Sequence, residues 1–324
     1  MQNSNPLLRI DTSFRSYLNA FTRSFKNHVV GDGALDYAFD ADFAVRQKIN
    51  GLSGWSKLSK CITTNDITQE AKNLFSRVSQ AGSLKYPEIY DIVKKCSERL
   101  ELNLPTVFVR NDTDKPMLYS IASEVIEPCI VITEAMLSKY TAKELQLLIG
   151  CECGRIQNNH SVYNMACTYL SFTKNGYKPI NRSYESAINN QVICALVEWV
   201  RYAEITADRA AMICLDSPSE FIDTMAGIYR KGYVDQYGKT EKEINTARIL
   251  QLADELHMVA ARQLKVEDSL NRTESRLLCA CEFLNSDALY RWRKDLSYGG
   301  IHAAAPQVCD IRCNMILDST KGVK

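Results

Sequence analysis

Apolar and polar positions follow two different periods along this chain, and the two periods predict helices and strands. Apolar residues recur every three or four positions over residues 67–80 and again over 86–100, which predicts two amphipathic helices. Two short runs rich in β-branched residues follow, TVFVR at 106–110 and CIVIT at 129–133, each after a proline. Such runs are typical of strands. A small sheet is therefore expected in the middle of the chain.

A largely buried helix is expected to begin after Thr141 and to run toward His160. Thr141 is suited to the N-cap, and Glu144 three positions later completes a capping box. Leucine and isoleucine then follow on several sides of the helix, which predicts burial. A second long helical segment is expected at about 186–215, and helical patterning continues to about residue 294. The predicted fold class is α+β, predominantly α.

The composition mainly excludes classes of partner and location. The chain has 324 residues, of which 46% are hydrophobic and 24% are charged, as in ordinary globular proteins. A formal net charge of +1, with scattered lysines and arginines, gives no basis for a nucleic-acid or anionic membrane partner. No apolar run approaches the ~18–20 residues that span a bilayer, and the N-terminus lacks a secretory pattern. A cytoplasmic protein without a membrane span is expected.

Twelve cysteines are spread along the chain, mostly among apolar neighbours, and no CxxC pair occurs. Free cysteine behaves as a small buried hydrophobe, and a reducing compartment keeps it as a thiol. We therefore expect neither a disulfide scaffold nor a zinc ribbon.

Three features occur in a fixed order: the two strand runs, the helix that contains CECGR at 151–155, and the segment EITADR at 204–209. This order resembles the zinc metallopeptidase family of the CAAX prenyl proteases and the bacterial membrane heat-shock peptidases. In that family the helix carries H-E-x-x-H, and a later E-x-x-A-D-R supplies the third zinc ligand. A looser match at 273–292 resembles the family's T-H-P-x-x-x-R-x-x-E segment and keeps Arg276 and Glu282.

The resemblance implies a zincin-like metallopeptidase domain with a small sheet packed on the active-site helix. It assigns the ligand positions to Cys151, Arg155 and Glu204, and the catalytic positions to Glu152 and Asp208. Family members bind zinc there, with the glutamate of H-E-x-x-H as general base.

Two of these ligand positions depart from the family pattern. Cys151 could bind a metal as a thiolate, but the guanidinium of Arg155 carries only donors and does not deprotonate in proteins. Zinc lowers the pKa of the water that it binds by about 8–9 units, which is worth roughly 12 kcal/mol. This effect is lost without the metal. A glutamate base alone supplies about 3–5 kcal/mol. We therefore expect no bound metal and no other cofactor.

Removal of a dication would leave Glu152, Glu204 and Asp208 close together, and clustered carboxylates repel one another or take up protons. Our hypothesis is that Arg155 supplies the missing positive charge by pairing with Glu204 or Asp208.

The leading functional hypothesis is a catalytically inactive pseudopeptidase that binds a peptide or protein. The family adds substrate peptides as an extra strand, and Cys129–Thr133 resembles that edge strand; strand addition needs no metal. One alternative is an active metalloendopeptidase with an altered zinc site that uses Cys151 and Glu204, and another is a structural scaffold. The expected organisation is an N-terminal segment of unknown role (1–60), a metallopeptidase-like domain (61–295) and a C-terminal tail (296–324).

Overall fold

The computed structural model describes residues 28–30, 33–77, 79–82, 84–123, 126–174, 190–233, 244–257, 270–300 and 302–319. The strands are β1 (Val29–Val30), β2 (Ala34–Leu35), β3 (Ser79–Gln80), β4 (Thr106–Arg110), β5 (Leu118–Ile121) and β6 (Cys129–Thr133). The first helices are α2 (Asp40–Asn50), α3 (Trp55–Cys61), a π-helical turn η3 (Ile62–Ile67), α4 (Thr68–Arg77), α5 (Pro87–Arg99), α6 (Glu134–Lys139), α7 (Ala142–Gln157) and α8 (Ser161–Lys174). The later ones are α9 (Asn190–Cys214), a 3-10 turn η4 (Pro218–Glu220), α10 (Phe221–Arg230), α11 (Thr246–His257), α12 (Arg272–Leu284), α13 (Asp287–Trp292) and α14 (Pro306–Ser319).

The predicted α+β class is confirmed, since helices surround a small mixed sheet of four strands in the order β3-β4-β6-β5. Both predicted strand runs are present as β4 and β6, which pair in parallel. All five residues of β6 are buried, and β6 also pairs with β5 on its other side, so it is an inner strand of the sheet. The expectation that Cys129–Thr133 is an edge strand is therefore wrong. Beside it, β5 is the outer strand of the described sheet.

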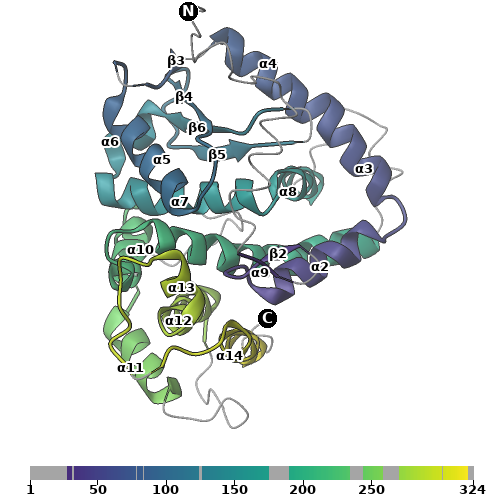
Figure 1. The fold of residues 1–324 in the computed structure, drawn as a ribbon. Helices are drawn as coiled ribbons and strands as arrows, with labels where there is room; N and C mark the ends of the chain where they lie inside the picture. The colour runs from purple at the N-terminus through teal and green to yellow at the C-terminus, as the bar shows by residue number, and fades with distance from the viewer. Residues whose placement is uncertain are drawn as a thin grey trace, which may run out of the picture.

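Helices α7 and α9 form the centre of the molecule, with the sheet on the far side of α7 and α11 to α14 beyond α9 (Figure 1). The predicted capping box at Thr141 and Glu144 is present and starts α7. Two glycines of α7 let α9 approach closely. A Cβ on Gly154 would lie 2.3 Å from the Cβ of Ala210, and one on Gly150 would lie 2.8 Å from the Cα of Ala211. This close packing fixes the relative position of the two helices.

The described part of the N-terminal segment packs on this centre. Asp42 of α2 is fully buried and accepts hydrogen bonds from Arg46, His160, Trp199 and Thr206. Residues 28–60, expected as a segment of unknown role, therefore contribute a buried anion to the interface with α8 and α9.

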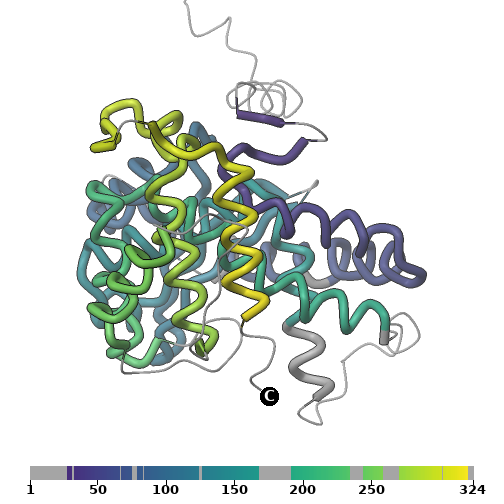
Figure 2. Tube along the Cα trace, turned by 90° about the horizontal axis from the view of Figure 1, so that it is seen from below, coloured from purple at the N-terminus to yellow at the C-terminus, as the bar shows by residue number. Residues whose placement is uncertain are grey.

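Within the predicted C-terminal tail (296–324), residues 306–319 form helix α14. Helix α14 lies beside α12 and near α2 (Figure 2). Its Asp310 pairs with Arg209 at 2.7 Å, and its Arg312 pairs with Glu282 at 2.6 Å. Both pairs are buried, so residues 306–319 are part of the packed structure. Among the described residues, no helix is both long and apolar enough to cross a membrane.

Candidate functional site

The structure brings together all five predicted site residues. Cys151, Glu152 and Arg155 lie within about one turn of each other on α7, and Glu204 and Asp208 lie one turn apart on α9. Contacts between the two helices bring the two groups together. All five side chains are buried. Their contacts show how three carboxylates fit into one protein interior.

Arg155 lies between two of the carboxylates. Its guanidinium donates from Nη1 to Oε1 of Glu152 at 2.5 Å and from Nη2 to Oε1 of Glu204 at 2.8 Å. The predicted ion pair between Arg155 and Glu204 is therefore present, whereas a direct pair between Arg155 and Asp208 is not among the ion pairs of the described residues. One guanidinium thus links α7 to α9 across their interface.

A second arginine, Arg276 of α12, completes the cluster. Its Nε and Nη2 donate to the two carboxylate oxygens of Asp208 at 2.5 and 2.6 Å, a fork-to-fork contact. Its Nη1 lies 2.8 Å from Oε2 of Glu204 and 3.1 Å from the hydroxyl of Tyr229. The thiol of Cys151 lies 3.9 Å from Oδ1 of Asp208. We call Cys151, Glu152, Arg155, Glu204, Asp208 and Arg276 the ion-pair cluster.

Sequence reasoning assigned no site role to two residues of this region. The sequence did point to Arg276, because it is the arginine kept in the looser family match at 273–292. It did not point to Ser120 of β5, yet the Ser120 hydroxyl donates to Oε2 of Glu152 at 2.7 Å and connects the sheet edge to the cluster. His160, expected to run on from the same helix, lies elsewhere: α7 ends at Gln157, and the Nε2 of His160 contacts Asp42 at 3.0 Å.

Burial and charge shift the pKa values of the cluster in different directions. Burial raises the pKa of Glu204, but Arg155 and Arg276 outweigh it and lower the pKa to about 2. Burial raises the pKa of Asp208 to about 6, because Arg276 only partly offsets it and Glu204 adds repulsion. Burial also raises the pKa of the Cys151 thiol well above its ordinary value. Cys151 is therefore a neutral thiol at neutral pH.

The donor set does not fit a zinc ion. A catalytic zinc site needs three protein ligands with lone pairs and an open position for water. At the three predicted ligand positions, Arg155 has no lone pair to offer, which leaves at most Cys151 and Glu204 where three ligands are needed. Both oxygens of Glu204 already accept from arginines. In the described part of the chain, no three His, Cys, Asp or Glu side chains are grouped as a metal site requires.

A small mixed sheet packs on the buried helix α7, and α9 supplies acidic side chains from the other side of α7. This arrangement is that of a zincin-like domain. Comparison with known sequences agrees: residues 83–258 match the profile of peptidase family M48. This match covers more than half of the 324 residues. The chain belongs to peptidase family M48.

One curated relative is the plastoglobule-localized metallopeptidase 48 of Arabidopsis thaliana, a chloroplastic protein. The two are 23% identical over 138 residues, which cover 43% of this chain and 39% of the relative. The chain thus matches well under half of that protein's length. No solved structure shows a significant match.

Proposed function

We propose that this chain is a family M48 protein without zinc-dependent peptidase activity, and that it binds an extended peptide at the edge of its sheet. The observation that supports the first part is the place of Arg155, whose guanidinium contacts both Glu152 and Glu204 where a metal would have to lie. Arg155 supplies one of the two positive charges that a dication would bring, and Arg276, which pairs with Glu204 and Asp208, supplies another. The carboxylates keep their counter-charge without a metal.

The chemistry of hydrolysis is weakened by the same contacts. A general base needs a free lone pair and a pKa near the working pH. Both oxygens of Glu152 already accept hydrogen bonds, one from Arg155 and one from Ser120.

Covalent catalysis by the cluster thiol is disfavoured as well. The nucleophile would be the thiolate, and burial among acids disfavours that form at Cys151. His160, the histidine nearest in sequence, contacts Asp42, so it is committed to another cluster. The proposal therefore does not include a cysteine peptidase.

Peptide binding is proposed for β5 in place of Cys129–Thr133. Within the described sheet, β5 pairs only with β6, which leaves one side of its backbone for an added strand. Main-chain hydrogen bonds of this kind give affinity without any metal. Ser120 lies on this strand and contacts Glu152, so the ion-pair cluster lies next to the proposed peptide position.

The test of inactivity is a metal analysis of the purified protein combined with cleavage of casein. We expect less than one zinc ion per chain and no chelator-sensitive cleavage of casein. The altered-site alternative expects stoichiometric zinc and chelator-sensitive cleavage that is lost in Glu204→Gln. Either of those results overturns the proposal.

Peptide binding is tested separately by amide hydrogen exchange in the presence of reduced, carboxymethylated casein. We expect slower exchange in β5 and no change in β3 at the opposite edge. Unchanged exchange in β5 would favour the scaffold alternative and leave the metal result standing. The cytoplasmic location and the absence of a nucleic-acid partner stay predictions.

A further inference from the structure

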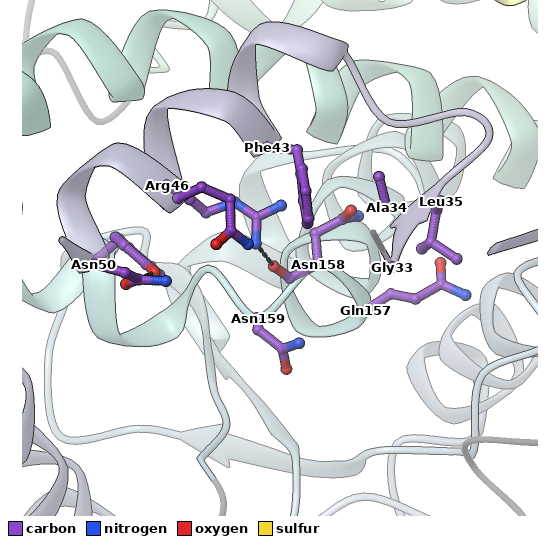
Figure 3. A pocket seen from close by; sticks show the side chains of 11 residues that line it. Gly33, Ala34, Leu35, Phe43, Arg46, Asn50, Gln157, Asn158 and Asn159 are labelled. Atoms are coloured by element: carbon purple, nitrogen blue, oxygen red, sulfur yellow. Dashed lines mark hydrogen bonds between the residues drawn. The ribbon is translucent and has the colours of Figure 1, made fainter. Parts of the chain in front are cut away.

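A cavity of about 400 Å³ lies between α2 and the turn that joins α7 to α8 (Figure 3). One face of α2 lines it with side chains three or four positions apart, and the turn lines it with three amide side chains. The lining residues are Gly33, Ala34, Leu35, Phe43, Arg46, Gln47, Asn50, Gln157, Asn158, Asn159 and Tyr163. None of them belongs to the ion-pair cluster, so the cavity is independent of the function proposed above. Its volume is within the range of small-molecule sites.

Arg46 gives the cavity its charge. Among the described residues that line the cavity, no carboxylate side chain is present, and Arg46 supplies the one positive charge. Its Nε donates to Asp42 at 3.1 Å, and its Nη1 donates to the backbone oxygen of Asn158 at 2.8 Å (Figure 3). Asp42 does not line the cavity and is saturated by other donors. The guanidinium is therefore held in place by Asp42, which lies outside the cavity, and by the backbone oxygen of Asn158, which is one of the lining residues.

Asn50 adds a second oriented donor. Its Oδ1 accepts from Nε1 of Trp55 at 3.0 Å and from the hydroxyl of Tyr163 at 2.7 Å. The rings of Trp55 and Tyr163 stack with centroids 4.9 Å apart, which fixes both donors. Since the oxygen of Asn50 is engaged by two donors, its amide NH₂ is the group left for a ligand.

Apolar surface accompanies these donors. The Phe43 ring lines the cavity and packs against the Arg46 guanidinium, 5.5 Å from its carbon to the ring centroid. Tyr163 supplies a second ring. A pocket with a guanidinium, an amide donor and aromatic walls suits a planar anion attached to a compact apolar group.

We infer that this cavity binds a small organic carboxylate, with its oxygens on Arg46 and Asn50. Two sources share this chemistry: a free aromatic or aliphatic acid and the C-terminal carboxylate of a peptide. The Nε and Nη1 of Arg46 already donate to Asp42 and Asn158, so its Nη2 and the NH₂ of Asn50 supply the donors. No acid among the described lining residues opposes the negative charge.

The test is a titration of the full chain with four probes, in which binding is detected by NMR from the chemical-shift changes of backbone amides. Benzoate is compared with benzamide, and N-acetyl-alanyl-alanine with its C-terminal amide. We expect saturable shifts around residues 43–50 and 157–163 with at least one acid, and weaker binding by about tenfold or more with its amide. Which of the two acids binds identifies the source.

Variants assign the binding to the cavity. Asn50→Asp keeps both accepted hydrogen bonds but replaces the donor with a negative oxygen, and Gln47→Glu adds a charge at an exposed lining position. Both variants should lower the affinity for the acid by about tenfold or more. Gln307→Glu, an equivalent change at an exposed position of α14 outside the cavity, should leave binding unchanged. The inference is overturned if the binding of neither acid saturates or if an acid and its amide bind equally. It is also overturned if Asn50→Asp binds the acid as tightly as the wild type does.

Discussion

Replacement of Arg155 by methionine tests whether the guanidinium balances the buried carboxylates. Methionine keeps most of the length and apolar character of the side chain but removes the charge and the contacts to Glu152 and Glu204. Glu204 keeps Arg276, and Glu152 keeps only the hydroxyl of Ser120. Removal of one partner of a buried ion pair costs about 3–5 kcal/mol. That is a large part of the roughly 5–15 kcal/mol that stabilises a domain.

The assay is urea denaturation, with the free energy of unfolding compared between variants. We expect Arg155→Met to lose about 3–5 kcal/mol. Addition of Glu152→Gln, which removes the carboxylate left without a cation, should restore about 1–3 kcal/mol of that loss. Arg230→Met, at an exposed position at the end of α10, serves as the control and should change stability by less than about 1 kcal/mol. A loss below about 1 kcal/mol for Arg155→Met, or no recovery in the double variant, would refute the reasoning.

Three further predictions follow from the packing and the charges. Gly154→Ala should cost about 1–3 kcal/mol in urea denaturation, because the new Cβ would lie 2.3 Å from that of Ala210; an equal cost for Gly82→Ala, which meets no atom within 4 Å, would contradict this. Asp42→Asn should cost about 3 kcal/mol at pH 7. Burial raises the pKa of Asp42, but its contacts outweigh this and hold the pKa well below the ordinary value. The stability it contributes is therefore present above about pH 4 and is lost as the pH falls further, so the difference between variant and wild type should shrink toward pH 3; a difference independent of pH would count against it. Arg276→Lys should cost about 2–4 kcal/mol by the same assay, because an ammonium cannot reproduce the fork contact with Asp208; wild-type stability would show that the fork contributes nothing.

Local patterns were sufficient to predict the elements that carry the site. The capping box at Thr141 and the helical spacing of Cys151 to Arg155 are properties of one helix, and they can be read without knowledge of the fold. The EITADR segment identified the second helix in the same way. Opposite charges in such a cluster are expected to pair, and for that reason the contact between Arg155 and Glu204 was also predictable.

Strand order and long-range contacts were not predictable in this way. The position of β5 beside β6 depends on pairing between distant segments, and the half-buried sequence LYSI has little apolar patterning to signal it. The apolar run at Cys129–Thr133 did contain a correct signal, because a strand buried on both faces reads as a continuous apolar run. The burial of Asp42 likewise depends on donors 118 and more positions away, such as His160. No local pattern marks an acid for that environment.

The central claim is that Arg155 stands where a metal ion would be needed. Zinc affinity, measured against a competing chelator, tests it in the wild type, in Cys151→His and in Cys151→His/Arg155→His. The double variant restores two imidazoles one turn apart on α7, with Glu204 as a third ligand. We predict one tightly bound zinc ion in the double variant, and none in the wild type or in Cys151→His, which keeps the guanidinium. A wild-type protein that binds one zinc ion per chain as tightly as the double variant would contradict the account.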